Sequence, residues 1–213
     1  MDVSIVIPLY NESESLEELN EWINRSFIDH SFSFEIIYID DGSNDKSWKI
    51  IEKIAKRNNN VKGISFNKNY GKSQALRVGF IECKGKYVAT LDADLQDSPE
   101  EIPVMIDKLI NNEFDMISGW KKKRYDSYFF KKIPSLFFNI VARFFSGIKL
   151  NDFNCGIKVY KIEVIKSINL YADMHRFIPI LAKNEGFKKI GEHVVKHQPR
   201  KYGVSKFGNE RFV

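Results

Sequence analysis

Short apolar runs alternate with helix-like segments throughout the first half of the chain. The run at residues 3–9, VSIVIPL, is almost wholly apolar, as is typical of a parallel strand covered on both faces. Strands alternating with helices predict an α/β fold with a mostly parallel sheet flanked by helices. We expect strands at residues 3–9, 34–39, 61–66, 87–91 and 115–118, and helices at residues 13–27, 45–58, 73–83 and 99–112.

The second half shows a less regular pattern of strands and helices. We find no internal repeat and no low-complexity linker, which predicts a single domain over residues 1–213. We expect a helix at 134–148, a strand near 155–160, helices near 161–168 and 176–185, and a strand ending at Val194.

The net charge of +5 conceals a difference between the two halves. Residues 1–119 carry 13 Lys and Arg against 21 Asp and Glu, whereas residues 120–213 carry 20 against 7. The resulting net charges of −8 and +13 suggest that the second half meets an anionic surface, unless its charges only face solvent. Phospholipid, a phosphorylated substrate and nucleic acid are candidates, but no groove-reading motif supports nucleic acid.

Two features indicate the compartment. The printed sequence has no run of 18 apolar residues and no basic segment followed by an apolar one at its start, so we expect neither a membrane span nor a secretory signal within it. Cys83 and Cys155 are too few for a disulfide framework, which indicates a reducing compartment.

Carboxylates gather in the loops that follow three of the expected strands. These loops contain Tyr10-Asn11-Glu12, Asp40-Asp41 and Asp92-Ala93-Asp94. Because the carboxyl ends of parallel strands share one edge of the sheet, we expect the three loops to form one ligand-binding cleft. Clustered carboxylates repel one another unless a cation or hydrogen-bond donors offset their charge.

Asp92 and Asp94 are the sharpest of these signals. In an extended segment, two residues separated by one other point their side chains the same way. Their oxygens then suit Mg²⁺ or Mn²⁺, which prefer hard ligands and share them with substrate phosphates. The alternative is a solvated turn in which the aspartates cap a helix.

Three other motifs carry less weight. No G-x-G-x-x-G follows the first strand, which argues against dinucleotide binding. The run Gly71-Lys72-Ser73 resembles the end of a phosphate loop but lacks its leading glycine. His193 and His197 are four residues apart, yet the valines between them favour a strand end over a zinc site.

The runs IVIPLYNES, IDDGSND and LDADLQDSPE resemble inverting family 2 glycosyltransferases with a Rossmann-like GT-A fold. The runs NYGKSQALRVGF, ISGWKKKRYD, LNDFNCGIKVY and RKYGVSKFG are similar to the polyprenyl-phosphate branch, which includes dolichyl-phosphate mannose synthases and bacterial polyprenyl-phosphate sugar transferases. The resemblance covers nearly the whole chain. It implies a nucleotide-sugar-binding half at 1–119 and an acceptor- and membrane-facing half at 120–213.

The resemblance also implies roles at matching positions. The nucleotide base and ribose would contact Pro8, Tyr10, Asn11, Glu12, Asp40 and Asp41. The divalent metal and the donor diphosphate would be bound by Asp92, Asp94 and Gln96. Acceptor or donor phosphates would be bound by Arg200, Ser205 and Lys206, around Gly203.

One departure concerns the phosphate contacts of the fifth strand. Many dolichyl-phosphate mannose synthases have Gly-Ser-Arg after this strand, whereas this chain has Gly119-Trp120-Lys121. The role could therefore fall to Lys121, Lys123 or Arg124. Members of the branch often carry C-terminal transmembrane helices, so we expect this chain to stop just after the catalytic domain of a membrane-anchored protein at the cytoplasmic membrane face.

The expected helix at 134–148 is unusually apolar. Its polar residues Asn139, Arg143 and Ser146 form one narrow stripe, and Lys131 and Lys132 precede it. Such a helix could lie in the headgroup plane of a membrane, where the basic half would attract anionic lipid, or it could be buried in the core.

The resemblance, together with these features, implies a metal-dependent, inverting transfer of a hexose from UDP-glucose or GDP-mannose to undecaprenyl or dolichyl phosphate. A polyprenyl phosphate is already an oxyanion and needs alignment and charge neutralisation but no general base. If the acceptor were a hydroxyl of a capsule or cell-wall polysaccharide, a base would be required, and Asp152 is the candidate unless it only shapes a turn. A catalytically silent membrane-binding module is a third possibility, which the paired aspartates disfavour.

Overall fold

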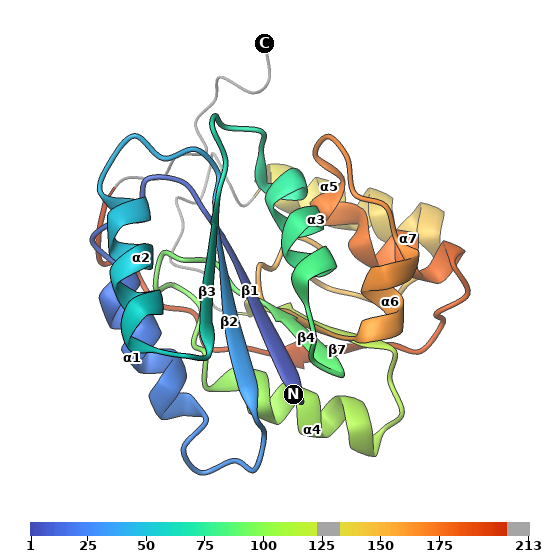
Figure 1. The fold of residues 1–213 in the computed structure, drawn as a ribbon. Helices are drawn as coiled ribbons and strands as arrows, with labels where there is room; N and C mark the ends of the chain where they lie inside the picture. The colour runs from blue at the N-terminus through green and yellow to red at the C-terminus, as the bar shows by residue number, and fades with distance from the viewer. Residues whose placement is uncertain (123–132, 204–213) are drawn as a thin grey trace.

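The computed structural model describes residues 1–122 and 133–203 of the chain (Figure 1). The strands in this part are β1 (Val3–Leu9), β2 (Phe34–Asp40), β3 (Val61–Ser65), β4 (Tyr87–Thr90), β5 (Met116–Trp120), β6 (Lys158–Lys161) and β7 (Ile190–Val194). The helices are α1 (Leu16–Ser26), α2 (Ser47–Arg57), α3 (Lys72–Glu82), α4 (Glu101–Asn111), α5 (Ile133–Ser146), α6 (Ile162–Ser167), the 3₁₀ helix η2 (Met174–Phe177) and α7 (Ile178–Asn184).

All of these strands belong to one mixed sheet with the order β3-β2-β1-β4-β6-β5-β7. The pairs β1–β2, β1–β4, β2–β3 and β5–β7 are parallel, which confirms the predicted mostly parallel α/β sheet. β6 is antiparallel to both of its neighbours, β4 and β5. A strand from the second half of the sequence therefore lies between two strands of the first half.

Helices cover both faces of the sheet (Figure 1). Ile5 and Ile7 of β1 belong to the buried cluster that α1, α2 and α4 complete, whereas Val6 belongs to the cluster formed with α3, α6 and α7. Successive strand residues point to opposite faces, so a strand buried on both sides must be apolar at nearly every position. This explains why β1 appears in the sequence as a continuous apolar run.

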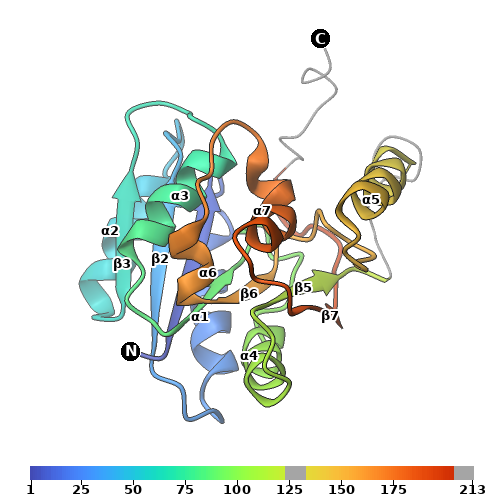
Figure 2. The ribbon, with the colours of Figure 1, turned by 90° about the vertical axis from the view of Figure 1, so that its right-hand side faces the viewer.

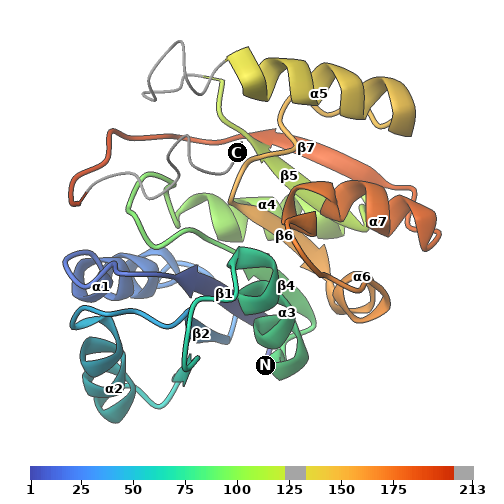
Figure 3. The same ribbon diagram turned by 90° about the horizontal axis from the view of Figure 1, so that it is seen from above.

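α5 lies at one end of the molecule, beyond β5 and β7, and α2 lies at the other end (Figures 2 and 3). A small separate cluster of buried residues, including Ala142, Leu150 and Phe153, connects α5 to the rest of the protein. None of the helices in residues 1–122 and 133–203 combines the length and the apolar composition needed to cross a bilayer.

Element boundaries differ from the sequence expectation where local chemistry intervenes. The helix expected at 176–185 begins as η2, and the regular helix α7 starts only at Ile178 with Pro179 in its first turn. Proline lacks an N–H and is accommodated in the first turn of a helix, which fixes the start of α7. The strand expected near 155–160 is β6, displaced to Lys158–Lys161.

Candidate active site

The acidic loops after β1, β2 and β4 meet at the carboxyl edge of the sheet. Backbone hydrogen bonds hold them together: the Asp41 N–H donates to the Leu9 carbonyl at 2.8 Å, and the Leu91 N–H donates to the Val6 carbonyl at 3.1 Å. The parallel order of β1, β2 and β4 thus produces the predicted gathering of carboxylates.

Asp40 and Asp41 are both buried and organise the loops around them. The Asp41 carboxylate accepts hydrogen bonds from the backbone N–H groups of Tyr70 at 2.7 Å and Gly71 at 2.9 Å. Gly71 has a φ of 92°, which favours glycine, and directly precedes α3. Asp40 accepts from the Ser43 N–H at 3.0 Å. These carboxylates therefore fix the start of α3 and the loop after β2.

The loop after β1 is attached to the loop after β2. The Asn11 N–H donates to Ser43 Oγ at 2.8 Å, and the Glu12 N–H donates to Ser47 Oγ at 3.0 Å. Asn11 has a φ of 54°, which asparagine tolerates better than most residues. Pro8, by contrast, is buried within β1 beside Ile39 of β2. Of the residues assigned to the nucleotide, Tyr10, Asn11, Glu12 and Asp41 thus lie in this pair of loops, whereas Asp40 ends β2 and Pro8 lies inside β1.

Asp92 and Asp94 both lie in the loop after β4, but the expectation that this segment is extended is wrong. Residues 93 and 94 form a turn, and Leu95 has a φ of 60°. The Asp92 carboxylate contacts Lys72 Nζ at 2.5 Å, and the Asp94 carboxylate contacts Arg200 Nη2 at 2.6 Å. Arg200 also lies 3.3 Å from Glu12. Each aspartate of the pair is therefore matched by a protein cation.

The electrostatics of the pair are unequal. At Asp94, burial and then the negative charge of Asp92 raise the pKa to about 6, although Arg200 opposes the shift. At Asp92, burial also favours the neutral acid, but the charges of Lys72 and Lys121 outweigh it and lower the pKa to about 2. The nearby cations therefore outweigh the cost of burial at Asp92 but not at Asp94.

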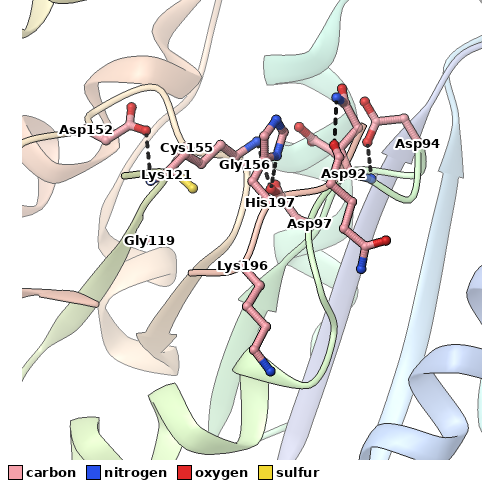
Figure 4. A network of polar contacts seen from close by, with 12 residues as sticks. Asp92, Asp94, Asp97, Gly119, Lys121, Asp152, Cys155, Gly156, Lys196 and His197 are labelled. Carbon is pink, nitrogen blue, oxygen red and sulfur yellow. Dashed lines mark hydrogen bonds and ion pairs between the residues drawn. The ribbon is translucent and has the colours of Figure 1, made fainter. Parts of the chain in front are cut away.

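A third aspartate of the same loop, Asp97, is fully buried and lies 2.8 Å from Lys121 Nζ and 3.3 Å from His197 Nδ1 (Figure 4). Burial alone would raise the pKa of Asp97, but the charge of Lys121 and the contact with His197 lower it. The structure thus places Lys121 on Asp97, with only 13% of its side chain exposed. Lys123, Arg124, Ser205 and Lys206, the other residues assigned to phosphate, lie outside the described residues.

Asp152 lies on the opposite side of Lys121 from Asp92 and Asp94 (Figure 4). It is buried, and its Oδ1 accepts the backbone N–H of Asn154 at 3.1 Å, the geometry of an aspartate-stabilised turn. Its Oδ2 accepts the Lys121 N–H at 3.5 Å. The structure therefore does not bring Asp152 into the group formed by Asp92 and Asp94.

Gln96 remains close to the paired aspartates through its backbone. Its N–H donates to Asp94 Oδ1 at 3.1 Å, whereas its side-chain amide donates to the Gln198 carbonyl at 3.3 Å. The Gln198 N–H in turn donates to the Gln96 carbonyl at 2.8 Å. The segment that carries Arg200 is thus held against the loop of the paired aspartates.

Sequence reasoning missed two residues of this site. In the sequence Lys72 belongs to an incomplete phosphate loop, and nothing in its spacing indicates that it reaches Asp92. Gly156 lies against the same carboxylate, because a Cβ added there would be 2.3 Å from Asp92 Oδ2. Both contacts depend on how α3 and the segment before β6 pack beside β4, which no local pattern encodes.

The described residues contain no group of three or more His, Cys, Asp or Glu side chains arranged to hold a metal by themselves. A divalent ion at Asp92 and Asp94 would therefore depend on further oxygen ligands from water or a bound phosphate, as is usual for Mg²⁺.

The α/β sheet with its acidic carboxyl edge has the GT-A fold. Structures of glucosyl-3-phosphoglycerate synthase from Mycobacterium tuberculosis share this fold. The complex with phosphoglyceric acid has a TM-score of 0.71 at 19% identity, covering 94% of this chain and 73% of the other. The complex with Mn²⁺ and UDP-glucose has a TM-score of 0.70, covering 94% and 72%. At this identity the likeness concerns the fold alone.

The chain belongs to Glycosyl transferase family 2, whose profile matches residues 4–168. Among its relatives, the dodecaprenyl-phosphate galacturonate synthase of Rhizobium johnstonii is 35% identical over 99% of this chain and 63% of its own length. The undecaprenyl-phosphate 4-deoxy-4-formamido-L-arabinose transferases of Pseudomonas fluorescens and Edwardsiella ictaluri are 36% and 37% identical over 99% of the chain. The chain spans only 61% and 64% of their lengths.

Proposed function

We propose that this chain is the catalytic domain of an enzyme that transfers a sugar from a nucleotide sugar to a polyprenyl phosphate. The observation that carries the proposal is the pair Asp92 and Asp94 at the carboxyl edge of the sheet, each matched by a cation. The relatives that match nearly the whole chain are named for transfer to dodecaprenyl and undecaprenyl phosphate, which supports the acceptor class.

The donor set at Asp92 and Asp94 fits Mg²⁺ or Mn²⁺. Carboxylate oxygens are the ligands that these ions prefer, and the ammonium and guanidinium groups found on the two aspartates show that the site accommodates positive charge. Asp92, Asp94 and Gln96 would hold the ion. When bound, it would neutralise negative charge that develops on the departing nucleoside diphosphate.

The chain's own residues would provide alignment and further neutralisation. Arg200 lies between Asp94 and Glu12, where its planar guanidinium can present two N–H groups to a phosphate. The acceptor phosphate is an oxyanion at neutral pH, so its oxygen can attack the anomeric carbon once the two are held in line. The bond to the leaving diphosphate breaks as the bond to the acceptor oxygen forms, with inversion at that carbon.

The exposed face of α5 supports a membrane-bound acceptor. Its polar residue Asn139 is turned inward, donating to the Asn151 carbonyl at 3.0 Å and accepting from the Phe153 N–H at 3.2 Å. Phe144 and Phe145 instead face outward with 82% and 81% of their surface exposed. A helix with its polar side toward the protein and two phenylalanines outward is suited to an apolar surface.

We therefore infer that α5 rests on the membrane that holds the lipid acceptor. Arg143 of α5 and Lys149, which follows the helix, are exposed and would attract anionic headgroups. Burying a phenylalanine contributes on the order of 1.5–3 kcal/mol. Replacing Phe144 and Phe145 by serine should therefore weaken binding to anionic vesicles more than about tenfold.

The vesicle experiment has a matched control in Ile28→Ser, which removes another apolar side chain that is 74% exposed but follows α1. Vesicles with anionic lipid and neutral vesicles are sedimented with each variant, at low and high salt. Stronger binding to anionic vesicles that salt weakens supports the inference. Equal binding of the α5 variant and the wild type would contradict it.

The donor is tested by thermal unfolding with a panel of UDP- and GDP-sugars in the presence of Mn²⁺, because a ligand that binds the folded state raises the melting temperature. UDP-glucose and GDP-mannose are the donors we propose. Nucleotide forms of galacturonate and of 4-deoxy-4-formamido-L-arabinose belong in the panel because relatives are named for these sugars. Asp94→Asn should abolish the shift, whereas Asp107→Asn, on the exposed side of α4, should preserve it.

A further inference from the structure

Lys72 reaches Asp92 because the start of α3 is fixed from two sides. Asp41 holds the backbone N–H groups of Tyr70 and Gly71, directly before the helix. On the other side, Ser73 Oγ accepts the His175 N–H at 3.0 Å and lies 3.1 Å from His175 Nδ1. Lys72 lies between these two sets of contacts, so the backbone from which its side chain extends to Asp92 is fixed.

The Asp92 carboxylate has little freedom to avoid this contact. The backbone at Gly156 lies so close to its oxygens that a Cβ there would be 2.3 Å from Oδ2 and 2.9 Å from Oδ1. Thr90 Oγ1 donates to the Gly156 carbonyl at 2.8 Å and fixes that backbone. Gly156 on one side and Lys72 at 2.5 Å from Oδ1 therefore restrict the position of the carboxylate.

The Lys72 ammonium and a divalent ion are both cations, and they would compete for the same oxygens of the Asp92 carboxylate. Their like charges repel at such short range, so full binding of one weakens the other. The Lys72 side chain is 20% exposed and that of Asp92 is 30% exposed, so solvent and ligands can reach the pair. Lys72 can therefore leave Asp92 without unpacking the core.

We propose that Lys72 exchanges partners when the donor binds. In the free enzyme its ammonium neutralises Asp92. The divalent ion then replaces the ammonium at Asp92, and the ammonium pairs with a phosphate oxygen of the nucleoside diphosphate. This inference rests on the proposed function, because it requires the ion and the diphosphate to bind at Asp92 and Asp94. It assigns to Lys72 a change of partner during donor binding.

Two consequences follow from the exchange. The ion alone binds weakly, because it must displace Lys72 while nothing compensates the released ammonium. The diphosphate strengthens binding of the ion, because it supplies the new partner for Lys72. Removing the lysine should therefore tighten binding of the ion alone and weaken binding of the diphosphate.

The exchange is tested by labelling lysines of the whole protein with an amine-acylating reagent and quantifying each site by mass spectrometry. The states compared are the free protein, the protein with Mn²⁺, and the protein with Mn²⁺ and UDP or GDP. We expect Lys72 labelling to rise several-fold with Mn²⁺ and to fall again with the diphosphate. Lys62, which pairs with Glu82 on the surface, is the internal control and should not change.

Two variants sharpen the experiment. In Asp92→Asn, Lys72 should be highly labelled from the start and should not respond to Mn²⁺. Lys72→Met should bind Mn²⁺ alone about fivefold more tightly in an electron paramagnetic resonance titration, the effect of removing one partly exposed ion-pair competitor. Lys62→Met should bind Mn²⁺ like the wild type.

Mn²⁺ binding that leaves Lys72 labelling unchanged would overturn the exchange and leave the proposed function intact. The same holds if Lys72→Met binds Mn²⁺ no more tightly than the wild type. Failure of the wild type to bind Mn²⁺ even with the diphosphate would instead overturn both the exchange and the metal dependence of the proposed function.

Discussion

Gly156→Ala tests whether the position of the Asp92 carboxylate controls the reaction. The added Cβ would lie 2.3 Å from Asp92 Oδ2 and 2.6 Å from its Cγ, whereas ordinary contacts begin near 3.4 Å. The carboxylate must therefore move by about 1 Å, a displacement that can reduce the rate of a positioned reaction about 100-fold. The backbone at Gly156 does not have a positive φ, so alanine itself introduces no backbone strain.

The assay is sugar transfer measured beside urea unfolding, in a cycle of Gly156→Ala, Asp92→Asn and the double variant. We expect Gly156→Ala to lose about 100-fold in transfer. Its stability should fall by less than about 1 kcal/mol, since the Lys72–Asp92 pair that it disturbs is partly exposed. If the glycine acts through Asp92, the double variant is no slower than Asp92→Asn. Transfer within about threefold of the wild type, or additive losses, would refute the reasoning.

Three further predictions concern the buried ion pair, the thiols and the metal. Lys121→Met should destabilise the fold by about 3 kcal/mol in urea unfolding, because it leaves the buried Asp97 without the Lys121 ammonium. Adding Asp97→Asn should restore much of the lost stability, and a loss below about 1 kcal/mol in Lys121→Met would contradict the pairing. Burial raises the pKa of both Cys83 and Cys155 to about 12. Ellman's reagent at pH 8 should therefore leave the native protein unlabelled and react with both thiols after unfolding. Rapid labelling of the native protein would contradict the burial of the thiols. EDTA should remove most binding of the nucleotide sugar in a calorimeter, and unchanged binding would argue against a metal at Asp92.

The strands and helices of the first half could be predicted because their patterns are local. β1 and β2 are buried on both faces and are therefore rich in apolar residues, and the amphipathic helix α1 between them shows the helical period. The acidic edge could also be predicted, since the parallel order follows from the alternation of strands and helices. These conclusions needed no knowledge of distant contacts.

The place of β6 could not be predicted in this way. It comes from the second half of the sequence, yet it pairs antiparallel with β4 and β5. The pairing depends on contacts between residues far apart in the chain, such as Ala89 beside Val159, and periodicity carries no information about them.

The cations that contact Asp92 and Asp94 could not be predicted either, because they come from distant parts of the chain. Lys72 is 20 residues from Asp92, and Arg200 is 106 residues from Asp94. The family resemblance implies a phosphate contact for Arg200, and the sequence around Lys72 indicates only an incomplete phosphate loop. Only the packing of α3 and of the segment after β7 beside the loop of β4 brings these side chains to the aspartates.

The sequence alone does not predict which face of α5 points outward. Its polar stripe is compatible with a buried helix and with a helix at a membrane surface. Asn139 turns out to bond to Asn151 and Phe153 inside the protein, which leaves Phe144 and Phe145 outside. The hydrogen-bonding needs of the loop at Asn151 thus decide which side of the helix faces outward.

The most direct test of the account compares two acceptors that differ only in the phosphate. The protein, Mn²⁺ and the radiolabelled donor found by thermal shift are incubated with undecaprenyl phosphate or with undecaprenol in detergent micelles, and the lipid-linked sugar is counted. A phosphate oxyanion attacks without a general base, whereas an alcohol requires one. The account predicts labelled product with the phosphate and background with the alcohol, in the wild type but not in Asp94→Asn. Equal transfer to both lipids, or no transfer to the phosphate, would contradict it.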